Sequence, residues 1–276
     1  MTWRELRSRQ FWRAVLAELL GTLVLVSTVL GSSMPGPGEA PVGTMYPAVA
    51  VGVVIVALGH CFGEISGAQV NPTVTLSLLA TRKVDLLKAL FYVAVQCLGA
   101  SLAAGALYLA LPLKTPADHF VNRVPIESNA AQALGIEVLC AFQMVFTIFS
   151  VEDQRRRECT EPGNLAIGLA HTASVLLGGR FSGACMNPAR ALGPAIITGF
   201  WENHWVFWIG PVLGGVLAGV SHEFFFARSA SRQKLVACLT CKDIEIVETA
   251  SMTGSSLSTV TQNAMRAKQA NKQDNN

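Results

Sequence analysis

The chain has 276 residues, of which 51% are hydrophobic and 14% are charged, with a net charge of +3 and a mean hydropathy of +0.42. Because a soluble domain carries about 25% charged residues, this composition excludes an ordinary water-facing surface and predicts a surface that faces lipid. The small net charge does not indicate binding to nucleic acid.

Six segments approach the roughly 20 apolar residues that a bilayer crossing needs. Two further apolar runs are too short to cross, and they fit half-helices that enter the membrane and turn back. The sequence therefore predicts an all-α integral membrane protein. In chain order, the expected elements are 11–32, 45–63, the half-helix 71–80, 86–110, 131–151, 163–180, the half-helix 187–198 and 204–227.

The two short runs belong to a repeated sequence. Residues 65–76 and 181–192 share six of twelve positions, including an Asn-Pro pair in each copy, Asn71-Pro72 and Asn187-Pro188. A buried acid precedes each pair by a similar distance, since Glu18 lies 53 residues before Asn71 and Glu137 lies 50 before Asn187. With three spans in each half, the second half must enter from the opposite face. This predicts an inverted three-plus-three repeat whose functional centre lies near the midplane.

The Asn-Pro pairs predict the chemistry of that centre. Pro72 and Pro188 suit the first turn of a helix, which puts Asn71 and Asn187 at or beside the cap positions. Two helix N-termini that meet present two positive dipole ends and two side-chain amides. A water that accepts hydrogen bonds from both amides is forced to turn, and a positive field repels cations. The alternative is that Asn-Pro is an ordinary turn signal.

Three charged residues fall at membrane depth, where charge is costly. Arg190 lies in the first turn of the second half-helix, where a cation opposes the dipole. We expect it to donate hydrogen bonds at a constriction, and the alternative is that it snorkels to the outer surface. We expect Glu18 and Glu137 to be structural acids, which accept hydrogen bonds from the irregular backbone before each half-helix.

With these motifs, the chain resembles the aquaporin family, also called the major intrinsic proteins, over about residues 10–227. The resemblance implies six spans with two half-helices, one pore in each protomer and four protomers in each assembly. It implies passive, bidirectional transport of water with exclusion of protons and ions. Trp201–Trp208 is similar to the stretch that opens the last span in animal water-selective members.

Counting from each Asn places the four filter positions of the family on Val51, Val175, Ala184 and Arg190. Water-selective relatives usually carry Phe and His at the first two. Two valines predict a wider, more apolar ring, through which hydrogen peroxide, ammonia, urea or glycerol could pass.

Two further residues are candidates to line the pore, Ile55 and His171. His171 lies one helical turn inward from Val175, on the same face; the alternative is a buried histidine bonded to a backbone carbonyl. Thr73 stands where the family usually has Ala. We expect it at the contact between the half-helices, where its methyl group fits and its hydroxyl can bond a nearby backbone group.

The expected organisation is a cytoplasmic N-terminus (1–10), a channel domain (11–227, with repeats 11–110 and 131–227) and a mostly disordered cytoplasmic tail (228–276). Basic residues crowd the inner side, which places both termini in the cytoplasm by the positive-inside rule, and the expected location is the plasma membrane. The expected partners are water, small neutral solutes, the bilayer and three further copies. We predict no cofactor, metal site or enzyme activity. The remaining alternative is a membrane junction or scaffold protein on the same fold.

Overall fold

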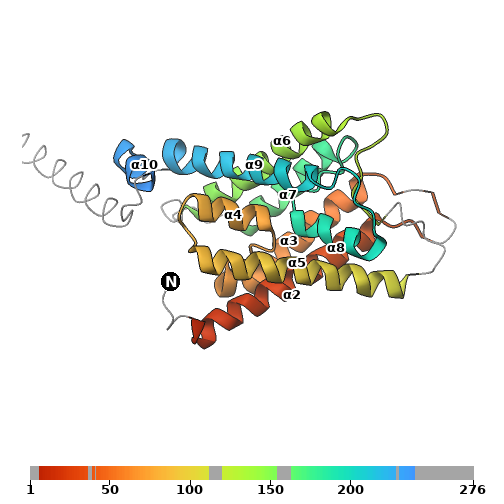
Figure 1. Ribbon diagram of the computed structural model, residues 1–276, viewed down its shortest axis with the longest axis horizontal. Helices are drawn as coiled ribbons and strands as arrows, with labels where there is room; N and C mark the ends of the chain where they lie inside the picture. The colour runs from red at the N-terminus through yellow and green to blue at the C-terminus, as the bar shows by residue number, and fades with distance from the viewer. Residues whose placement is uncertain are drawn as a thin grey trace, which may run out of the picture. The chain divides into compact units, whose positions relative to one another are not determined.

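The computed structural model describes residues 6–36, 39–40, 42–111, 120–153, 163–227 and 230–239. In these ranges the regular secondary structure is helical. The helices are α2 (Arg9–Ser33), α3 (Met45–Ser66), α4 (Pro72–Ala80), α5 (Leu86–Ala110), α6 (Ala130–Glu152), α7 (Gly163–Gly178), α8 (Pro188–Thr198), α9 (Val206–Ser221), the π-helical turn η3 (His222–Phe226) and α10 (Arg232–Leu239) (Figure 1).

Local sequence sets the helix ends. Ser8 caps α2 by accepting a hydrogen bond from the backbone N–H of Phe11 at 3.1 Å. Asn129 and Gln132 form a capping box at the start of α6, which satisfies two otherwise unpaired amides. The αL residue Gly67 ends α3 (φ 92°) and Gly199 ends α8 (φ 73°), because glycine adopts this conformation without strain.

Five helices are long and apolar enough to cross a membrane: α2, α3, α5, α6 and the stretch Val206–Phe226 that begins with α9. The sixth expected span, α7, is apolar and 16 residues long. The residues before it, 154–162, lie outside the described part. The predicted all-α membrane fold is thus confirmed, with helix bounds close to the expected ones.

The helix α2 shows how the chain is adapted to lipid. Trp12, Leu16 and Leu20 are between 43% and 52% exposed, at a spacing of four residues. The opposite face buries Glu18 and Thr22 completely. A helix that exposes apolar side chains and hides a carboxylate is the reverse of a helix on a water-soluble protein. Its outer face suits a hydrocarbon solvent.

The two halves pack in equivalent ways. In the first half α2 packs against α3 and α5, and in the second α6 packs against α7 and α9. Close approach depends on small residues: a Cβ on Gly99 of α5 would lie 2.5 Å from the Leu19 carbonyl oxygen of α2, and one on Gly214 of α9 would clash with the Val138 backbone of α6. Such contacts are typical of helix packing in membranes.

The half-helices cross from one half to the other. α4 packs against α9, and α8 packs against α5. Both begin near the middle of the bundle and run toward opposite ends (Figure 1). This arrangement brings the two Asn-Pro pairs together.

The chain divides into two units, Met1–His222 and Glu223–Asn276. The second contains α10, an eight-residue helix. The other residues of the predicted tail, 228–229 and 240–276, lie outside the described residues, as do 1–5.

Candidate functional site

A buried carboxylate organises the backbone before α4. Glu18, which is fully buried, accepts hydrogen bonds from the Ser66 hydroxyl at 2.7 Å and from the backbone N–H groups of Gln69 and Val70 at 2.9 and 2.7 Å. The Gln96 amide of α5 adds a fourth at 2.8 Å. These bonds satisfy a non-helical segment that would otherwise leave buried amides unpaired.

Glu137 of α6 repeats this arrangement before α8. Its carboxylate accepts hydrogen bonds from the Ser182 hydroxyl at 2.7 Å and from the backbone N–H groups of Cys185 and Met186, both at 2.8 Å. Each acid therefore reaches across from the first helix of its own half to the segment that leads into the half-helix. The hydrogen bonds expected from the sequence are present in both halves.

Four residues in these segments have left-handed backbone conformations: Ala68 (φ 46°), Val70 (φ 44°), Ala184 (φ 43°) and Met186 (φ 53°). Ala68 and Ala184 lie three residues before the Asn of their half, and Val70 and Met186 lie directly before it. Such a conformation costs a non-glycine residue about 1–3 kcal/mol, and it persists only where the surroundings enforce it. The carboxylate bonds supply that enforcement, and the curled backbone places each Asn at the start of its half-helix.

Each Asn caps the half-helix that follows it. The Asn71 Oδ1 atom accepts a hydrogen bond from the Thr73 N–H at 2.9 Å. The Asn187 Oδ1 atom accepts from the N–H groups of Ala189 and Arg190 at 3.0 and 3.3 Å. Pro72 and Pro188 are the first residues of α4 and α8, where a missing N–H costs nothing.

The two Asn side chains also join the halves. The Asn71 Nδ2 donates to the Met186 carbonyl at 3.0 Å, and the Asn187 Nδ2 donates to the Val70 carbonyl at 3.0 Å. Because an amide NH₂ carries two hydrogens, each Asn keeps one N–H beyond this bond. Both donors belong to residues that line the same cavity.

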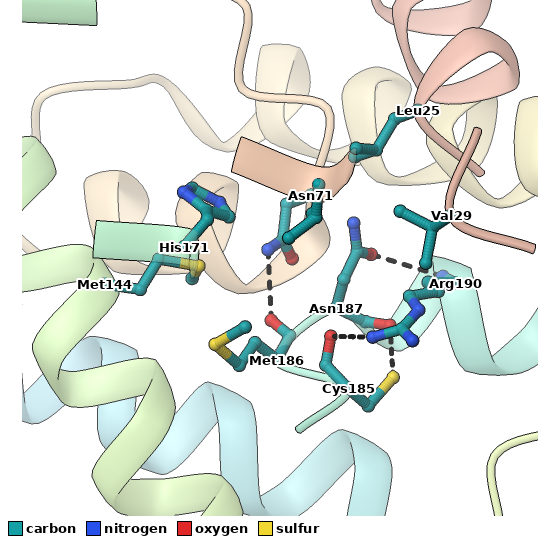
Figure 2. Close-up of a pocket in the computed structure, with 10 residues that line it drawn as sticks. Leu25, Val29, Asn71, Met144, His171, Cys185, Met186, Asn187 and Arg190 are labelled. Atoms are coloured by element: carbon teal, nitrogen blue, oxygen red, sulfur yellow. Dashed lines mark hydrogen bonds between the residues drawn. The ribbon is translucent and has the colours of Figure 1, made fainter. Parts of the chain in front are cut away.

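That cavity has a volume of about 20 Å³, counted as the space open to the centre of a water-sized sphere. A single water needs about 10–15 Å³ on this measure, so the space suits a solute of water's size. Figure 2 shows the side chains that surround it. The lining residues are Leu25, Val29, Val51, Asn71, Met144, His171, Cys185, Met186, Asn187 and Arg190.

Arg190 lies at this cavity and is held by the backbone of the preceding segment. Its Nη1 donates to the carbonyl oxygen of Ala184 at 3.0 Å and to that of Cys185 at 3.4 Å. Figure 2 shows the contact with Cys185. These bonds hold the guanidinium at the cavity, so the side chain does not extend to the outer surface. It adds a fixed positive charge beside two helix N-termini.

The other expected filter and pore residues divide into two groups. Val51 and His171 line the cavity with Arg190. Val175, Ala184 and Ile55 are buried in a hydrophobic cluster to which α2, α3, α4 and α6 contribute, and they are not among the residues that line this cavity. Their assignment to the pore remains a prediction.

His171 combines both features considered for it. The residue is 7% exposed and lines the cavity. Its Nδ1 also lies 2.8 Å from the Ile167 carbonyl oxygen, one turn earlier on α7. A backbone bond and a place at the cavity therefore do not exclude each other.

The expectation for the Thr73 hydroxyl is wrong. Its Oγ1 is buried and has no hydrogen-bond partner within the described chain. The backbone carbonyl one turn earlier belongs to the non-helical segment before Asn71, so the usual partner of a helical threonine is out of place. Its methyl group faces Gly215 of α9, where an added Cβ would lie 2.6 Å away.

Five lining residues were missed as pore candidates or given little weight: Leu25, Val29, Met144, Cys185 and Met186. A signal was available for two of them. Leu25 lies seven residues after Glu18, and Met144 lies seven residues after Glu137. Seven residues are about two helical turns, so each shares the inward face of its acid.

The arrangement can accept a small neutral molecule and reject a cation. Its polar donors are amide and guanidinium N–H groups, and the rest of the wall is mostly apolar. Within the described residues, no group of three or more His, Cys, Asp or Glu side chains could hold a metal ion.

Comparison with known proteins places this geometry in a family. A model of the family "Major intrinsic protein" matches residues 5–222. Aquaporin-4 of Homo sapiens is 41% identical over 222 residues, which cover 79% of this chain and 69% of that protein. Aquaporin-2 of Rattus norvegicus is 41% identical over 236 residues, or 85% and 87% of the two chains. The X-ray structure of the aquaglyceroporin from Plasmodium falciparum superimposes with a TM-score of 0.68 at 21% identity, over 77% of this chain and 95% of that one, a likeness of fold alone.

Proposed function

Because this chain belongs to the major intrinsic protein family, a family of multi-pass membrane proteins, we propose that it forms a passive, bidirectional channel for water. Membership also indicates a transporter and not an enzyme. The observation that carries the proposal is the water-sized cavity between Asn71 and Asn187, each of which keeps an amide N–H beyond its bond to the other half. Its relatives, which are named aquaporin-4 and aquaporin-2, support the same function.

In this proposal the two amides fix the orientation of the central water. Its oxygen accepts from Asn71 and Asn187, so both of its O–H bonds point away from them. A chain of waters with such a centre cannot relay a proton from one side to the other. Arg190 and the two helix N-termini add a positive field that repels cations. The residues before the half-helices, held by Glu18 and Glu137, keep this centre in place.

The test is osmotic. Vesicles that contain the purified protein are exposed to an osmotic step, and shrinkage is followed by light scattering. We expect faster shrinkage than in empty vesicles, without faster equilibration of a proton gradient. Val51→Trp should plug the cavity, whereas Val53→Trp, on the exposed face of the same helix, should conduct normally. Equal shrinkage with and without protein would overturn the proposal.

A second candidate function is transport of small neutral solutes besides water. It is favoured by Val51, an aliphatic residue at the cavity where the family resemblance implies a Phe in water-selective members. The same vesicles in gradients of glycerol, urea, hydrogen peroxide and ammonia measure this directly. Val51→Phe should reduce solute flux more than water flux. If the wild type passes water alone, this candidate is rejected.

We also propose a homotetramer in the plasma membrane, with both termini in the cytoplasm. Exposed apolar faces on several helices, including Met45 and Leu90, offer surface for lipid and for neighbouring protomers. Cross-linking in native membranes should give a four-chain species, and tags at both ends should be protected in intact cells. A monomer, or a tag that is accessible from outside, would contradict the proposal.

A further inference from the structure

We propose that His171 is a specificity-determining residue of the pore, which offers a hydrogen-bond acceptor opposite the amide donors of Asn71 and Asn187. The solutes it favours are small neutral molecules that can accept one hydrogen bond and donate another at the same time, namely water, hydrogen peroxide and ammonia. This inference rests on the proposed channel function and deepens it.

The tautomer of His171 follows from its backbone contact. Nδ1 lies 2.8 Å from the Ile167 carbonyl oxygen, and a carbonyl oxygen can only accept. Nδ1 therefore carries the proton, and in the neutral ring Nε2 carries a lone pair. The backbone bond thus fixes both the ring orientation and the atom that is left to act as an acceptor.

The Nε2 atom is available to a solute. It makes no hydrogen bond within the described chain, and it is not one of the fully enclosed polar atoms that lack a partner. The space that His171 lines is the cavity of Asn71 and Asn187, and the proposal places Nε2 at this cavity. Figure 2 shows the ring beside Asn71 and Met144.

The other lining side chains are poorer acceptors. The Asn187 Oδ1 atom already accepts from two backbone N–H groups of its half-helix, and the Asn71 Oδ1 atom accepts from one and keeps one lone pair beside that bond. The Cys185 sulfur accepts from the Asn122 amide at 2.9 Å, and thioethers such as that of Met144 accept only weakly. The side-chain lining would thus provide donors almost exclusively without His171. With it, a solute can accept from an Asn and donate to the ring.

The proposal also predicts how acid changes the pore. A protonated His171 has no lone pair and carries a charge next to two helix N-termini. The other titratable or charged side chains at the cavity are Cys185 and Arg190, whereas α2, α3 and α6 contribute Leu25, Val29, Val51 and Met144. Mild acid adds a proton to an imidazole and leaves a thiol as it is, so an acid response of the cavity is assigned to His171.

The experiment compares three variants with the wild type in vesicles. His171→Phe keeps a ring but removes the acceptor, and His171→Gln restores an acceptor at a similar distance from the backbone. The matched control is His60→Phe, because the His60 Nδ1 makes the same bond to the carbonyl one turn earlier (Val56, 2.9 Å) but the residue does not line the cavity. Permeability to water, hydrogen peroxide and ammonia is measured from neutral pH to well below the ordinary histidine pKa of about 6.5.

We expect His171→Phe to lower the permeability to these three solutes by about fivefold, the factor that corresponds to one net hydrogen bond of about 1 kcal/mol. His171→Gln and His60→Phe should stay within about twofold of the wild type. The wild type and His60→Phe should lose permeability in acid, and both His171 variants should not. Equal losses in His171→Phe and His171→Gln, or an acid response that survives in both, would overturn the proposal while leaving the water channel intact. A wild type that does not conduct at all would overturn the channel itself, and this inference with it.

Discussion

Asn71 and Asn187 each hold the segment that leads to the other, since each side-chain amide donates at 3.0 Å to the carbonyl of the residue before its counterpart. Each also caps its own half-helix. Neither residue serves only its own half. The position of each Asn at the cavity therefore depends on the bond made by the other.

This reciprocity should appear in a double-mutant cycle. Asn71→Ala and Asn187→Ala each remove a cap and a cross-link, and each should lower the free energy of unfolding in mixed micelles by about 1–3 kcal/mol. The second change removes bonds that the first has already weakened. The loss of unfolding free energy in the double variant should therefore be about 1 kcal/mol smaller than the sum of the two single losses. Asn71→Ala combined with Asn129→Ala, at the distant cap of α6, should be additive. Additivity in both pairs would contradict the coupling.

The Thr73 hydroxyl should destabilise the folded protein. It is buried without a partner, so Thr73→Val, which keeps the shape and removes the hydroxyl, should raise the free energy of unfolding by about 1 kcal/mol. Thr75 of the same helix provides the control, because its hydroxyl donates to the Gln69 side-chain oxygen at 2.7 Å. Thr75→Val should destabilise by about 1–2 kcal/mol. If Thr73→Val and Thr75→Val shift the free energy of unfolding in the same direction, the Thr73 hydroxyl is not the unpaired group described here.

Close packing of α2 on α5 should depend on Gly99. Gly99→Ala would place a Cβ 2.5 Å from the Leu19 carbonyl oxygen and 3.2 Å from the Leu23 nitrogen. Since both atoms are backbone, the helices must separate, and we expect a loss of about 2 kcal/mol or more. On the same helix, an added Cβ at Gly105 would lie 3.5 Å from the Ile197 side chain, which is an ordinary contact. Gly105→Ala should therefore be neutral or stabilising, and thermal melts of the two variants compare them directly.

A pH effect on stability is expected from His204, in the turn before α9. The Trp208 indole donates to its Nε2 at 3.1 Å, and partial burial lowers the pKa of the ring below its usual value. The folded state thus binds the proton less readily than the unfolded chain. The stability that the neutral ring provides is complete above the unfolded pKa of about 6.5 and declines as the pH falls through it.

The measurement is the apparent Tm at neutral and mildly acidic pH. His204→Gln cannot take up a proton in this range, so its Tm should drop less on acidification than that of the wild type. An identical drop in both proteins would show that the acid response comes from other groups.

The half-helices were the most predictable part of the fold. Asn-Pro supplies a cap and a first-turn residue together, so the starts of α4 and α8 could be read directly from the chain. The buried acids were likewise visible, because a carboxylate in an apolar span needs partners. These features depend on local chemistry that one segment carries by itself.

The pore wall was harder to predict, because it depends on which face of each helix turns inward and at what depth. Counting back from Asn187 finds the position of Val175 along α7 but not the direction of its side chain at the cavity. His171, one turn away, lines the cavity where Val175 does not. Leu25 and Met144 carry no polar signal, and only their equal spacing from Glu18 and Glu137 marks them.

The crossed packing of α4 on α9 and of α8 on α5 means that neither half is complete alone. Each half contributes one short helix that is embedded in the other half, so half a chain would present an unfilled groove and an exposed helix. A passage between the two half-helices therefore exists only where both halves are present.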